Sequence, residues 1–278
     1  MTYLIIGLII LFLVLLYLFA IMPRMFHRPD KTSFKGGYFA HRGLFDNESQ
    51  APENSLPAFQ KAVEKGFGIE MDVQLTKDKV PVVFHDFTLK RACKKDGKVE
   101  QYTYEELQQF TLFESKEHIP TLEEVLKVIG GRVPIIVELK IEWLDYSVCP
   151  VADKILSRYQ GAYAIESFNP LGLIWYRKNR KEIVRGQLAD HFRKEGTAKG
   201  PFYFLLHYMT MNFLTRPDFI AYNHKYPKNI SRRLCRYLYR ATAAGWTIKN
   251  EEQLKAAKEN FDWFIFDSFV PQEKSCQK

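Results

Sequence analysis

Short apolar runs alternate with helix-like segments from residue 38 onward, and this alternation is the feature that most limits how the chain can fold. The eight apolar runs cover residues 38–43, 68–76, 133–140, 162–169, 182–189, 219–224, 243–248 and 262–267. Between them, helix-like segments cover residues 55–66, 103–110, 121–131, 153–161 and 251–260. Repeated strand–helix units predict a parallel sheet, and eight of them predict an α/β fold closed into a (β/α)8 barrel, the TIM barrel.

Local signals at the ends of two helix-like segments agree with this prediction. Asn54 and Ser55 stand at the start of the first segment and Gly66 at its end, which is the usual pattern of a capped helix. Thr121 stands three residues before Glu124, the spacing of a capping box. With 278 residues, of which 46% are hydrophobic and 26% charged, the chain can bury one large α/β core or two small ones.

The N-terminus predicts a transmembrane anchor over residues 1–23. No charged side chain occurs there, and residues 3–22 are mostly aliphatic, which gives a helix of about 30 Å, long enough to cross a bilayer. A cleaved signal peptide is the alternative. The segment has no basic region at its start and no A-x-A cleavage site, so an uncleaved anchor in contact with the lipid bilayer is favoured.

Residues 24–37 predict a polar juxtamembrane linker, which leaves residues 38–278 for the globular domain. The linker carries a cluster of positive charges: Arg24, Arg28, Lys31 and Lys35. By the positive-inside rule, this bias predicts a single-pass protein of the cell membrane with its globular domain on the cytoplasmic side.

Charge and cysteine spacing exclude some classes of function. The 40 Lys and Arg residues exceed the 32 Asp and Glu residues, but they are scattered, which favours an anionic membrane surface or a phosphate-bearing substrate over nucleic acid. The cysteines, Cys93, Cys149, Cys235 and Cys276, lie far apart and lack metal-binding spacing, so isolated reduced thiols are expected. Oligomeric state leaves no signal in the sequence.

The segment IEMDVQLTKDKVPVVFHD, residues 69–86, departs from the parallel scheme. Only TKDK separates its two apolar runs, so we expect an antiparallel hairpin extending the barrel. Pairing Leu75 with Val80 would bring Glu70 opposite His85. Strand alternation places Glu70 and Asp72 on one face, which points into the barrel mouth if the segment is the second barrel strand. A solvated edge hairpin is the alternative.

Three predicted strands and the returning arm of the hairpin carry residues suited to one reaction. They are His41, Arg42, Glu70, Asp72, His85, Glu138 and Lys140, which a barrel would bring to one rim. Three carboxylates suit one hard divalent ion, Mg²⁺ or Ca²⁺. Arg42 and Lys140 suit a phosphate, and His41 and His85 suit a general acid and base. Together these residues predict phosphodiester cleavage.

Nine sequence motifs occur in order between residues 38 and 271. They are AHRG (40–43), APENSLPAF (51–59), IEMDVQLTKD (69–78), HDFTLKR (85–91), IPTLEEVL (119–126), VELK (137–140), ESFNP (166–170), GWTIKN (245–250) and a final Asp267. With these motifs the chain resembles the glycerophosphodiester phosphodiesterases, whose barrel is shared with phosphatidylinositol-specific phospholipase C.

The resemblance implies a function and a role for each matched residue. The function is metal-dependent hydrolysis of glycerophosphodiesters to glycerol phosphate and an alcohol. The implied roles are metal binding by Glu70, Asp72 and Glu138, acid and base by His41 and His85, and phosphate binding by Arg42 and Lys140. Trp246 would line the substrate pocket, Glu53 and Asn54 would support the loop after His41, and residues 88–120 would form a small insertion at the mouth.

Some points stay open. The family usually has Thr in place of Ser55, and a glycine-containing segment where this chain has the bulkier residues 260–269. The aromatic residues 201–226 either pack on the barrel or lean on the bilayer and present a lysophospholipid. The residues do not decide which histidine is the acid, or whether water or a glycerol hydroxyl attacks. Alternative functions are a phospholipase C- or D-type enzyme acting on membrane lipid, and a non-catalytic lipid- or phosphate-binding module.

Overall fold

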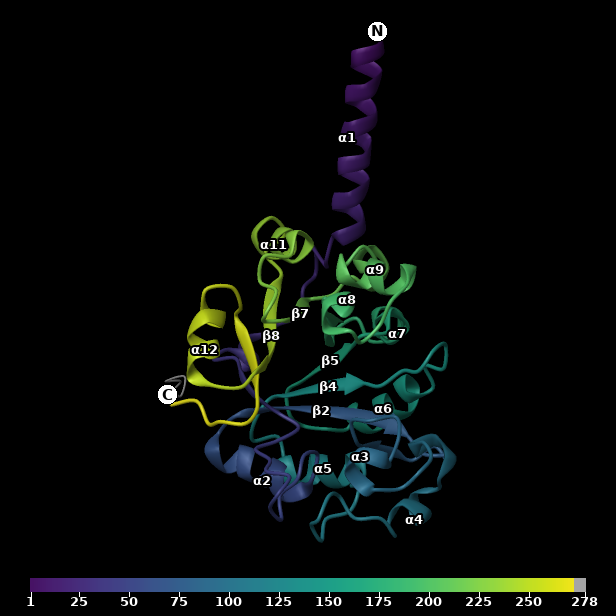
Figure 1. Cartoon of the computed structure of the whole chain (residues 1–278), viewed down its shortest axis with the longest axis vertical. Helices are drawn as coiled ribbons and strands as arrows, with labels where there is room; N and C mark the ends of the chain where they lie inside the picture. The colour runs from purple at the N-terminus through teal and green to yellow at the C-terminus, as the bar shows by residue number, and fades with distance from the viewer. Residues whose placement is uncertain (273–278) are drawn as a thin grey trace.

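The computed structural model describes residues 1–272, which form a long N-terminal helix standing on an α/β barrel (Figure 1). The strands are β1 (Tyr38–His41), β2 (Gly68–Leu75), β3 (Pro81–Val83), β4 (Ile135–Leu139), β5 (Tyr163–Ser167), β6 (Val184–Ala189), β7 (Phe219–Asn223), β8 (Thr242–Ile248) and β9 (Trp263–Phe266). The longer helices are α1 (Thr2–Ile21), α2 (Leu56–Lys65), α5 (Leu122–Ile129), α6 (Val148–Leu156), α7 (Pro170–Asn179), α11 (Ile230–Tyr237) and α12 (Glu251–Lys258). Shorter helices are η1 (Thr32–Phe34), α3 (Lys90–Cys93), η2 (Val99–Gln101), α4 (Tyr104–Leu107), α8 (Phe192–Glu195), α9 (Pro201–His207) and α10 (Asn212–Thr215).

The sheet closes on itself as the sequence predicts. Strand β1 pairs in parallel with β9 on one side and with β2 on the other, and the remaining strands pair in parallel around the ring. Each of the eight predicted apolar runs coincides with one of the eight parallel strands, although β8 begins one residue before its run, and β3 adds an antiparallel strand to β2. The TIM-barrel prediction is therefore confirmed.

Alternation along the strands divides the barrel interior into two layers. An apolar layer at the amino ends of the strands includes Phe39, Ile136 and Phe219. The next inward positions towards the carboxyl ends are polar, among them Glu70 and Glu138. Gly186 makes room for this packing, because a β-carbon there would lie 2.1 Å from the Phe219 ring. The polar layer consequently rests on a solid apolar floor.

The predicted helix caps of α2 and α5 are present. Ser55 caps α2 by accepting a hydrogen bond from the Ala58 amide, and Gly66 ends the helix in the left-handed conformation, at φ 72°. Thr121 and Glu124 form the capping box of α5. The predicted helix over residues 153–161 is wrong in its bounds, because α6 begins at Val148 and ends at Leu156, where its buried face ends.

The predicted hairpin forms, but its predicted register is wrong by one residue. Leu75 pairs with Pro81 rather than with Val80. The cause is Thr76, whose amide donates to the Val80 carbonyl while its hydroxyl accepts from the Val80 amide at 2.9 Å. The turn is therefore one residue longer than TKDK, and Glu70 does not lie opposite His85.

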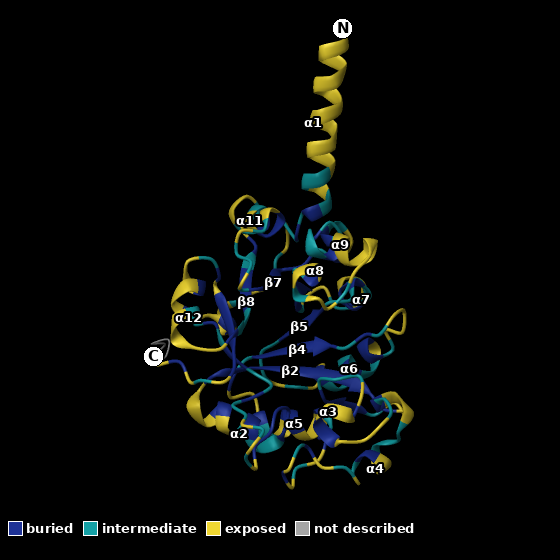
Figure 2. Cartoon of the chain, in the orientation of Figure 1, coloured by how far each residue is buried: buried dark blue, intermediate teal, exposed yellow. Residues whose placement is uncertain are grey.

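Residues 88–120 form the insertion at the mouth, on the lower right in Figure 1. It holds α3, η2 and α4 around a separate small core that includes Leu89, Val99, Leu107 and Ile119. Figure 2 shows dark, buried stretches among intermediate and exposed ones around α3 and α4. This core fixes the insertion against β3 and the end of β2.

Helix α1 is exposed along most of its length and buried only at its base (Figure 2). Its length and composition are those of a helix that can cross a membrane. At the base, Ile21 is buried, the Asn212 side chain donates to the Ile21 carbonyl at 2.9 Å, and the Tyr239 hydroxyl donates to the Leu18 carbonyl at 2.9 Å. The helix is thus joined to the barrel by specific contacts with its last turn.

The segment between α1 and β1 lies against the amino-terminal face of the barrel. Arg24 pairs with Asp218 at 3.6 Å, and the Lys31 amino group donates to the Asp218 carbonyl at 3.3 Å. The Phe34 ring stacks on Trp263 with centroids 5.3 Å apart, and Phe34 is buried. Phe34 therefore closes the apolar floor of the barrel from below.

Three of the four cysteines fall within the described residues. Cys93, Cys149 and Cys235 are buried and unpaired, as the spacing in the sequence predicts. Burial raises the pKa of each of these thiols to about 12, which keeps them protonated. Cys276 lies outside the described residues.

Candidate active site

Three carboxylates meet inside the carboxyl end of the barrel. Glu70 and Asp72 lie on one face of β2, and the parallel register places Asp72 beside Glu138 of β4. One oxygen from each residue lies within 4.8 Å of the other two, and all three residues are buried. Glu70 Oε2 and Asp72 Oδ1 accept no hydrogen bond from any described residue, although the Lys140 amino group lies 3.4 Å from Asp72 Oδ1. Buried carboxylate oxygens without donors are costly, and a hard divalent cation is the group that best fits this set.

The pKa shifts show how crowded the negative charge is. Burial raises the pKa of Glu70 well above its usual value, and the charge of Asp72 raises it further. Burial also raises the pKa of Glu138. Burial alone would raise the pKa of Asp72, but its neighbours His85, Lys140 and Arg42 outweigh burial and hold the pKa well below its usual value. A bound divalent cation would favour the ionised form of all three carboxylates.

Glu166 of β5 is a fourth buried carboxylate at this level of the barrel. It lies beside Glu138 in the sheet register, and its Oε2 accepts no hydrogen bond from the residues described. Burial raises its pKa well above the usual value, and the charge of Glu138 adds to the effect. Glu166 is the first residue of the motif ESFNP, but no role was predicted for it.

Two cationic side chains border the carboxylates. The Lys140 amino group lies 3.0 Å from Glu138 and 3.4 Å from Asp72. The Arg42 guanidinium lies 2.8 Å from Glu53 and 3.5 Å from Asp72. Arg42 Nε makes no hydrogen bond within the described part of the chain. The structure therefore brings the two predicted phosphate-binding residues to the same cluster.

His41, at the end of β1, is held by a carboxylate from the opposite end of the sequence. Its Nδ1 lies 2.9 Å from Asp267 Oδ2, and its Nε2 lies 4.0 Å from Glu70. Burial lowers the pKa of His41, although the charge of Asp267 opposes this shift. Asp267 fixes the ring so that Nε2 faces the carboxylates. The only signal for this role in the sequence is that Asp267 ends the last motif.

His85 is held in the same way by its neighbour in the sequence. Its Nδ1 lies 2.6 Å from Asp86, which also accepts from Arg91 at 2.7 Å. Arg91 belongs to α3 of the insertion and pairs with Glu53 at 2.6 Å, and Glu53 pairs with Arg42. This chain of ion pairs connects the insertion to both sides of the site. Sequence reasoning missed Asp86 and Arg91 as positioning residues.

The loop after β1 supports the cluster through its backbone. Arg42 and Asn54 both adopt positive φ, at 60° and 57°. The Asn54 amide donates to the Arg42 carbonyl at 2.9 Å, and its side chain donates to Asp72 at 3.0 Å. Gly43 allows the loop to approach α2, because a β-carbon there would lie 2.8 Å from the Ala58 backbone. Glu53 and Asn54 thus both contact the residues they were predicted to support.

Trp246 lies at the mouth of the barrel but outside the cluster of charged residues. Its ring packs edge-on against Phe168, with centroids 5.7 Å apart. Phe168 in turn lines the large groove that leads away from Glu138 and Lys140. The ten predicted site residues are therefore gathered at one end of the barrel, with Trp246 on its rim.

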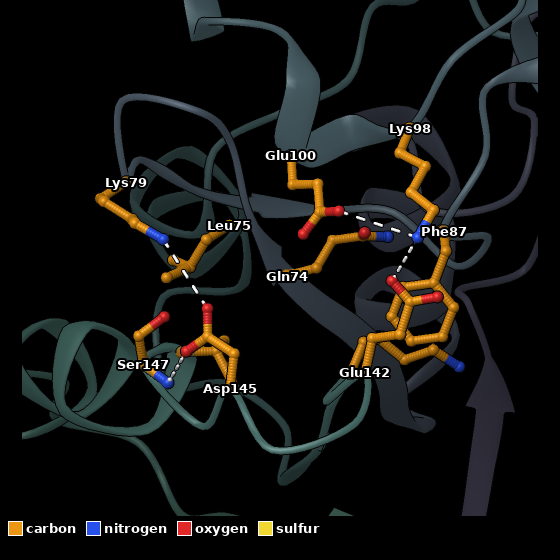
Figure 3. Close-up of a pocket in the computed structure, with 11 residues that line it drawn as sticks. Gln74, Leu75, Lys79, Phe87, Lys98, Glu100, Glu142, Asp145 and Ser147 are labelled. Atoms are coloured by element: carbon orange, nitrogen blue, oxygen red, sulfur yellow. Dashed lines mark hydrogen bonds and ion pairs between the residues drawn. The ribbon is translucent and has the colours of Figure 1, made fainter.

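A small polar pocket of about 50 Å³ lies beside Lys140, at the wall of the mouth (Figure 3). The Lys98 amino group of the insertion lies 2.6 Å from Glu142, in the loop after β4. Lys79 of the β2–β3 turn pairs with Asp145 of the same loop at 3.9 Å. The Lys98–Glu142 pair ties the insertion to the loop after β4, while the exposed Lys79–Asp145 pair adds little.

Comparison with protein families gives one match that covers most of the chain. The model of the "Glycerophosphoryl diester phosphodiesterase family" matches residues 41–269. A glycerophosphodiester phosphodiesterase of Caldanaerobacter subterraneus subsp. tengcongensis is 33% identical over 187 residues, which are 59% of this chain and 75% of that protein. A glycerophosphodiester phosphodiesterase of Bacillus altitudinis is 38% identical over 124 residues, 42% of this chain and 49% of that protein.

Solved structures match over the whole barrel. A phosphodiesterase of Oleispira antarctica, in complex with the product sn-glycerol-3-phosphate, superposes with a TM-score of 0.67 at 25% identity, covering 85% of this chain and 94% of that one. A glycerophosphodiester phosphodiesterase of Thermotoga maritima superposes with a TM-score of 0.61 at 25% identity, covering 83% and 93%.

Proposed function

Because the chain belongs to the glycerophosphoryl diester phosphodiesterase family, and is therefore a phosphoric diester hydrolase, we propose that it hydrolyses glycerophosphodiesters with the help of one divalent cation. The products are glycerol phosphate and an alcohol. The observation that carries the proposal is the meeting of the buried carboxylates Glu70, Asp72 and Glu138 with His41 and Lys140 at one end of the barrel.

Glu70, Asp72 and Glu138 are the proposed ligands of the cation, Mg²⁺ or Ca²⁺. Glu70 and Asp72 each keep one buried oxygen that accepts no hydrogen bond from the described residues, which supports this role. When bound, such an ion would polarise a phosphoryl oxygen and offset its charge. Arg42 and Lys140 bind the other non-bridging oxygens and stabilise the negative charge that develops in the transition state.

His41 and His85 are the proposed acid and base. Each ring has its Nδ1 held by a carboxylate, which leaves Nε2 as the atom that exchanges a proton. One histidine takes a proton from the nucleophile, and the other gives a proton to the leaving alcohol. The lowered pKa of His41 favours a neutral ring, which suits the proton acceptor. The net reaction consumes one water, whether water or a glycerol hydroxyl attacks first.

Helix α1 is the proposed single-pass anchor in the cell membrane. Its length and hydropathy support this proposal. The positive charges after it, among them Arg24 and Arg28, favour a cytoplasmic barrel by the positive-inside rule. An anchored enzyme would meet lysophospholipids of the bilayer as well as soluble glycerophosphodiesters, and we include both in the proposed substrate class.

The test is a panel of glycerophosphodiesters assayed with the purified full chain in detergent. Glycerophosphocholine should be cleaved to glycerol phosphate and choline, chelation should abolish turnover, and added Mg²⁺ or Ca²⁺ should restore it. His41→Ala or His85→Ala should lower kcat at least about 100-fold without unfolding the chain. Release of phosphocholine would instead assign a phospholipase C-type reaction. Failure of every divalent ion to give turnover would contradict the proposal and favour a binding module.

A further inference from the structure

A large apolar groove begins at the proposed catalytic residues and runs along one side of the mouth. Its volume is about 780 Å³, and Glu138 and Lys140 line its inner end. Its walls come from the loops after β4 and β5 and from α7, α9 and α10. They include Trp143, Leu144, Phe168, Tyr203, Leu206 and Leu214. A groove of this size and lining fits an extended apolar ligand whose polar end lies at the carboxylates.

The outer end of the groove lies at the base of α1. Met211 and Leu214 line the groove, and Phe213 between them packs on Phe19 of α1 with ring centroids 5.9 Å apart. The Asn212 side chain also bonds the end of α1. Figure 1 shows α9 directly below the base of α1. The groove therefore leads from the proposed site of chemistry towards the point where α1 would enter a bilayer.

The surface around this outer end suits a bilayer interface. Helix α9 exposes Phe204 at 62% and Phe202 at 42%. Arg193 and Lys199 lie in and just after α8, before the start of α9. Exposed aromatic side chains with basic residues beside them are typical of segments that rest on anionic lipid.

The other walls of the mouth are polar in the described part of the chain. His85 and Arg91 stand on the side of the insertion, and the pocket of Figure 3 adds Lys98 and Glu142. Such a wall suits a head-group alcohol, whereas the apolar groove suits hydrocarbon. Among the described residues, one apolar groove opens beside Glu138, which favours one chain per substrate.

We propose that this groove binds the acyl chain of a monoacyl glycerophospholipid that enters from the bilayer around α1. The inference rests on the proposed phosphodiesterase activity and specifies the lipid-binding part of its substrate site. In the reaction, the bond between phosphorus and the head-group alcohol oxygen breaks, and a bond between phosphorus and an oxygen supplied by water forms. The alcohol leaves with one proton of that water, and acylglycerol phosphate remains with its acyl ester intact.

Groove variants test the proposal through the ratio of two activities. Phe202→Glu and Leu214→Glu place a carboxylate in the groove at half-exposed positions, where folding should tolerate it. The substrates are glycerophosphocholine, which has no chain, and a short-chain lysophosphatidylcholine kept below its critical micelle concentration. We expect each variant to lower kcat/KM for the lysolipid about tenfold or more and to leave that for glycerophosphocholine unchanged. Leu205→Glu, on α9 and 40% exposed but outside the groove, is the matched control and should change neither.

Binding gives a second measurement that does not depend on turnover. In the His41→Ala background, a lysophosphatidylcholine with a brominated chain should quench the fluorescence of Trp143, which lines the groove. Trp143→Phe should remove that quenching, and Leu214→Glu should weaken it.

The outcomes separate the two proposals. Cleavage of glycerophosphocholine without cleavage or binding of the lysolipid would overturn the groove assignment and leave the proposed function standing. No turnover of either substrate with Mg²⁺ or Ca²⁺ would contradict the proposed function. The quenching of Trp143 fluorescence would then test the groove assignment by itself. Equal losses on both substrates, or faster cleavage of a two-chain phospholipid than of the lysolipid, would also overturn the single-chain assignment.

Discussion

Asp267 and Asp86 hold the Nδ1 atoms of the two proposed catalytic histidines, but they lie at very different distances from them along the sequence. Asp267 lies 226 residues after His41, at the end of the last strand, whereas Asp86 follows His85 directly. An ionised carboxylate at Nδ1 fixes both the ring orientation and the tautomer. These aspartates are positioning residues, since they act through the imidazoles.

We predict that Asp267→Asn lowers kcat for glycerophosphocholine by about tenfold or more while KM changes little. The amide still fills the space, but it can donate to Nδ1 and so favour the wrong tautomer. Steady-state kinetics on the purified chain checks this prediction, with thermal unfolding to show that the fold is kept. Ser268→Ala, which removes only a hydroxyl bonded to Asp267, is the control and should retain most of kcat. A parallel rise in KM with unchanged kcat would argue against a role through His41.

Most residues of the candidate site could be predicted from their positions at the ends of strands. Glu70, Asp72 and Glu138 follow from strand alternation and parallel register alone. The partner of His41 could not be predicted in this way, because nothing local connects it to Asp267. The hairpin register failed for a related reason: one side-chain hydrogen bond from Thr76 lengthened the turn, and hydrophobic pattern does not report such a bond.

Among the helices, the clearest sequence signals are the capping residues at their ends. Thr121 accepts from the Glu124 amide, and the Glu124 side chain accepts from the Thr121 amide at 2.8 Å. By contrast, α7 was not predicted, although Asn169 caps it and Pro170 stands at its first position. Its apolar residues are spread around the helix rather than gathered in one stripe, so periodicity gives little signal.

We predict that Thr121→Ala lowers the free energy of unfolding by about 1 kcal/mol, because the capping hydrogen bond at the start of α5 is lost. Urea unfolding of the barrel without residues 1–20 gives the measurement. Thr121→Ser keeps the hydroxyl and should recover most of the loss. Equal stability of the Ala and Ser variants would show that the cap contributes nothing.

At the scale of the whole molecule, the barrel and its N-terminal segment form one packed unit. The eight apolar runs were sufficient to predict the closed sheet. The docking of residues 21–34 on the barrel could not be predicted, because their sequence resembles the end of a membrane anchor followed by a polar linker. Their partners are single side chains and carbonyls far along the chain, such as Asp218 and Trp263.

We predict that a chain lacking residues 1–20 folds and cleaves glycerophosphocholine like the full chain. A chain lacking residues 1–36 should be less stable, because it loses the buried Phe34 ring, whose burial contributes about 1.5–3 kcal/mol. Phe34→Ala in the shorter truncation is the matched control and should cost about 3 kcal/mol or more. Urea unfolding monitored by circular dichroism compares the three. Equal midpoints for both truncations would show that the segment is only a tether.

The contacts at the base of α1 also fix the rotation of the helix about its own axis. Tyr17 bonds Ser231, Tyr239 bonds the Leu18 carbonyl, and Asn212 bonds the Ile21 carbonyl. Inserting one residue above Tyr17 would turn the free part of the helix by about 100° and leave the junction intact. Inserting one residue below Leu18 would break the junction itself. The first four turns of α1 can thus be exchanged for any apolar helix, whereas the last turn belongs to the barrel.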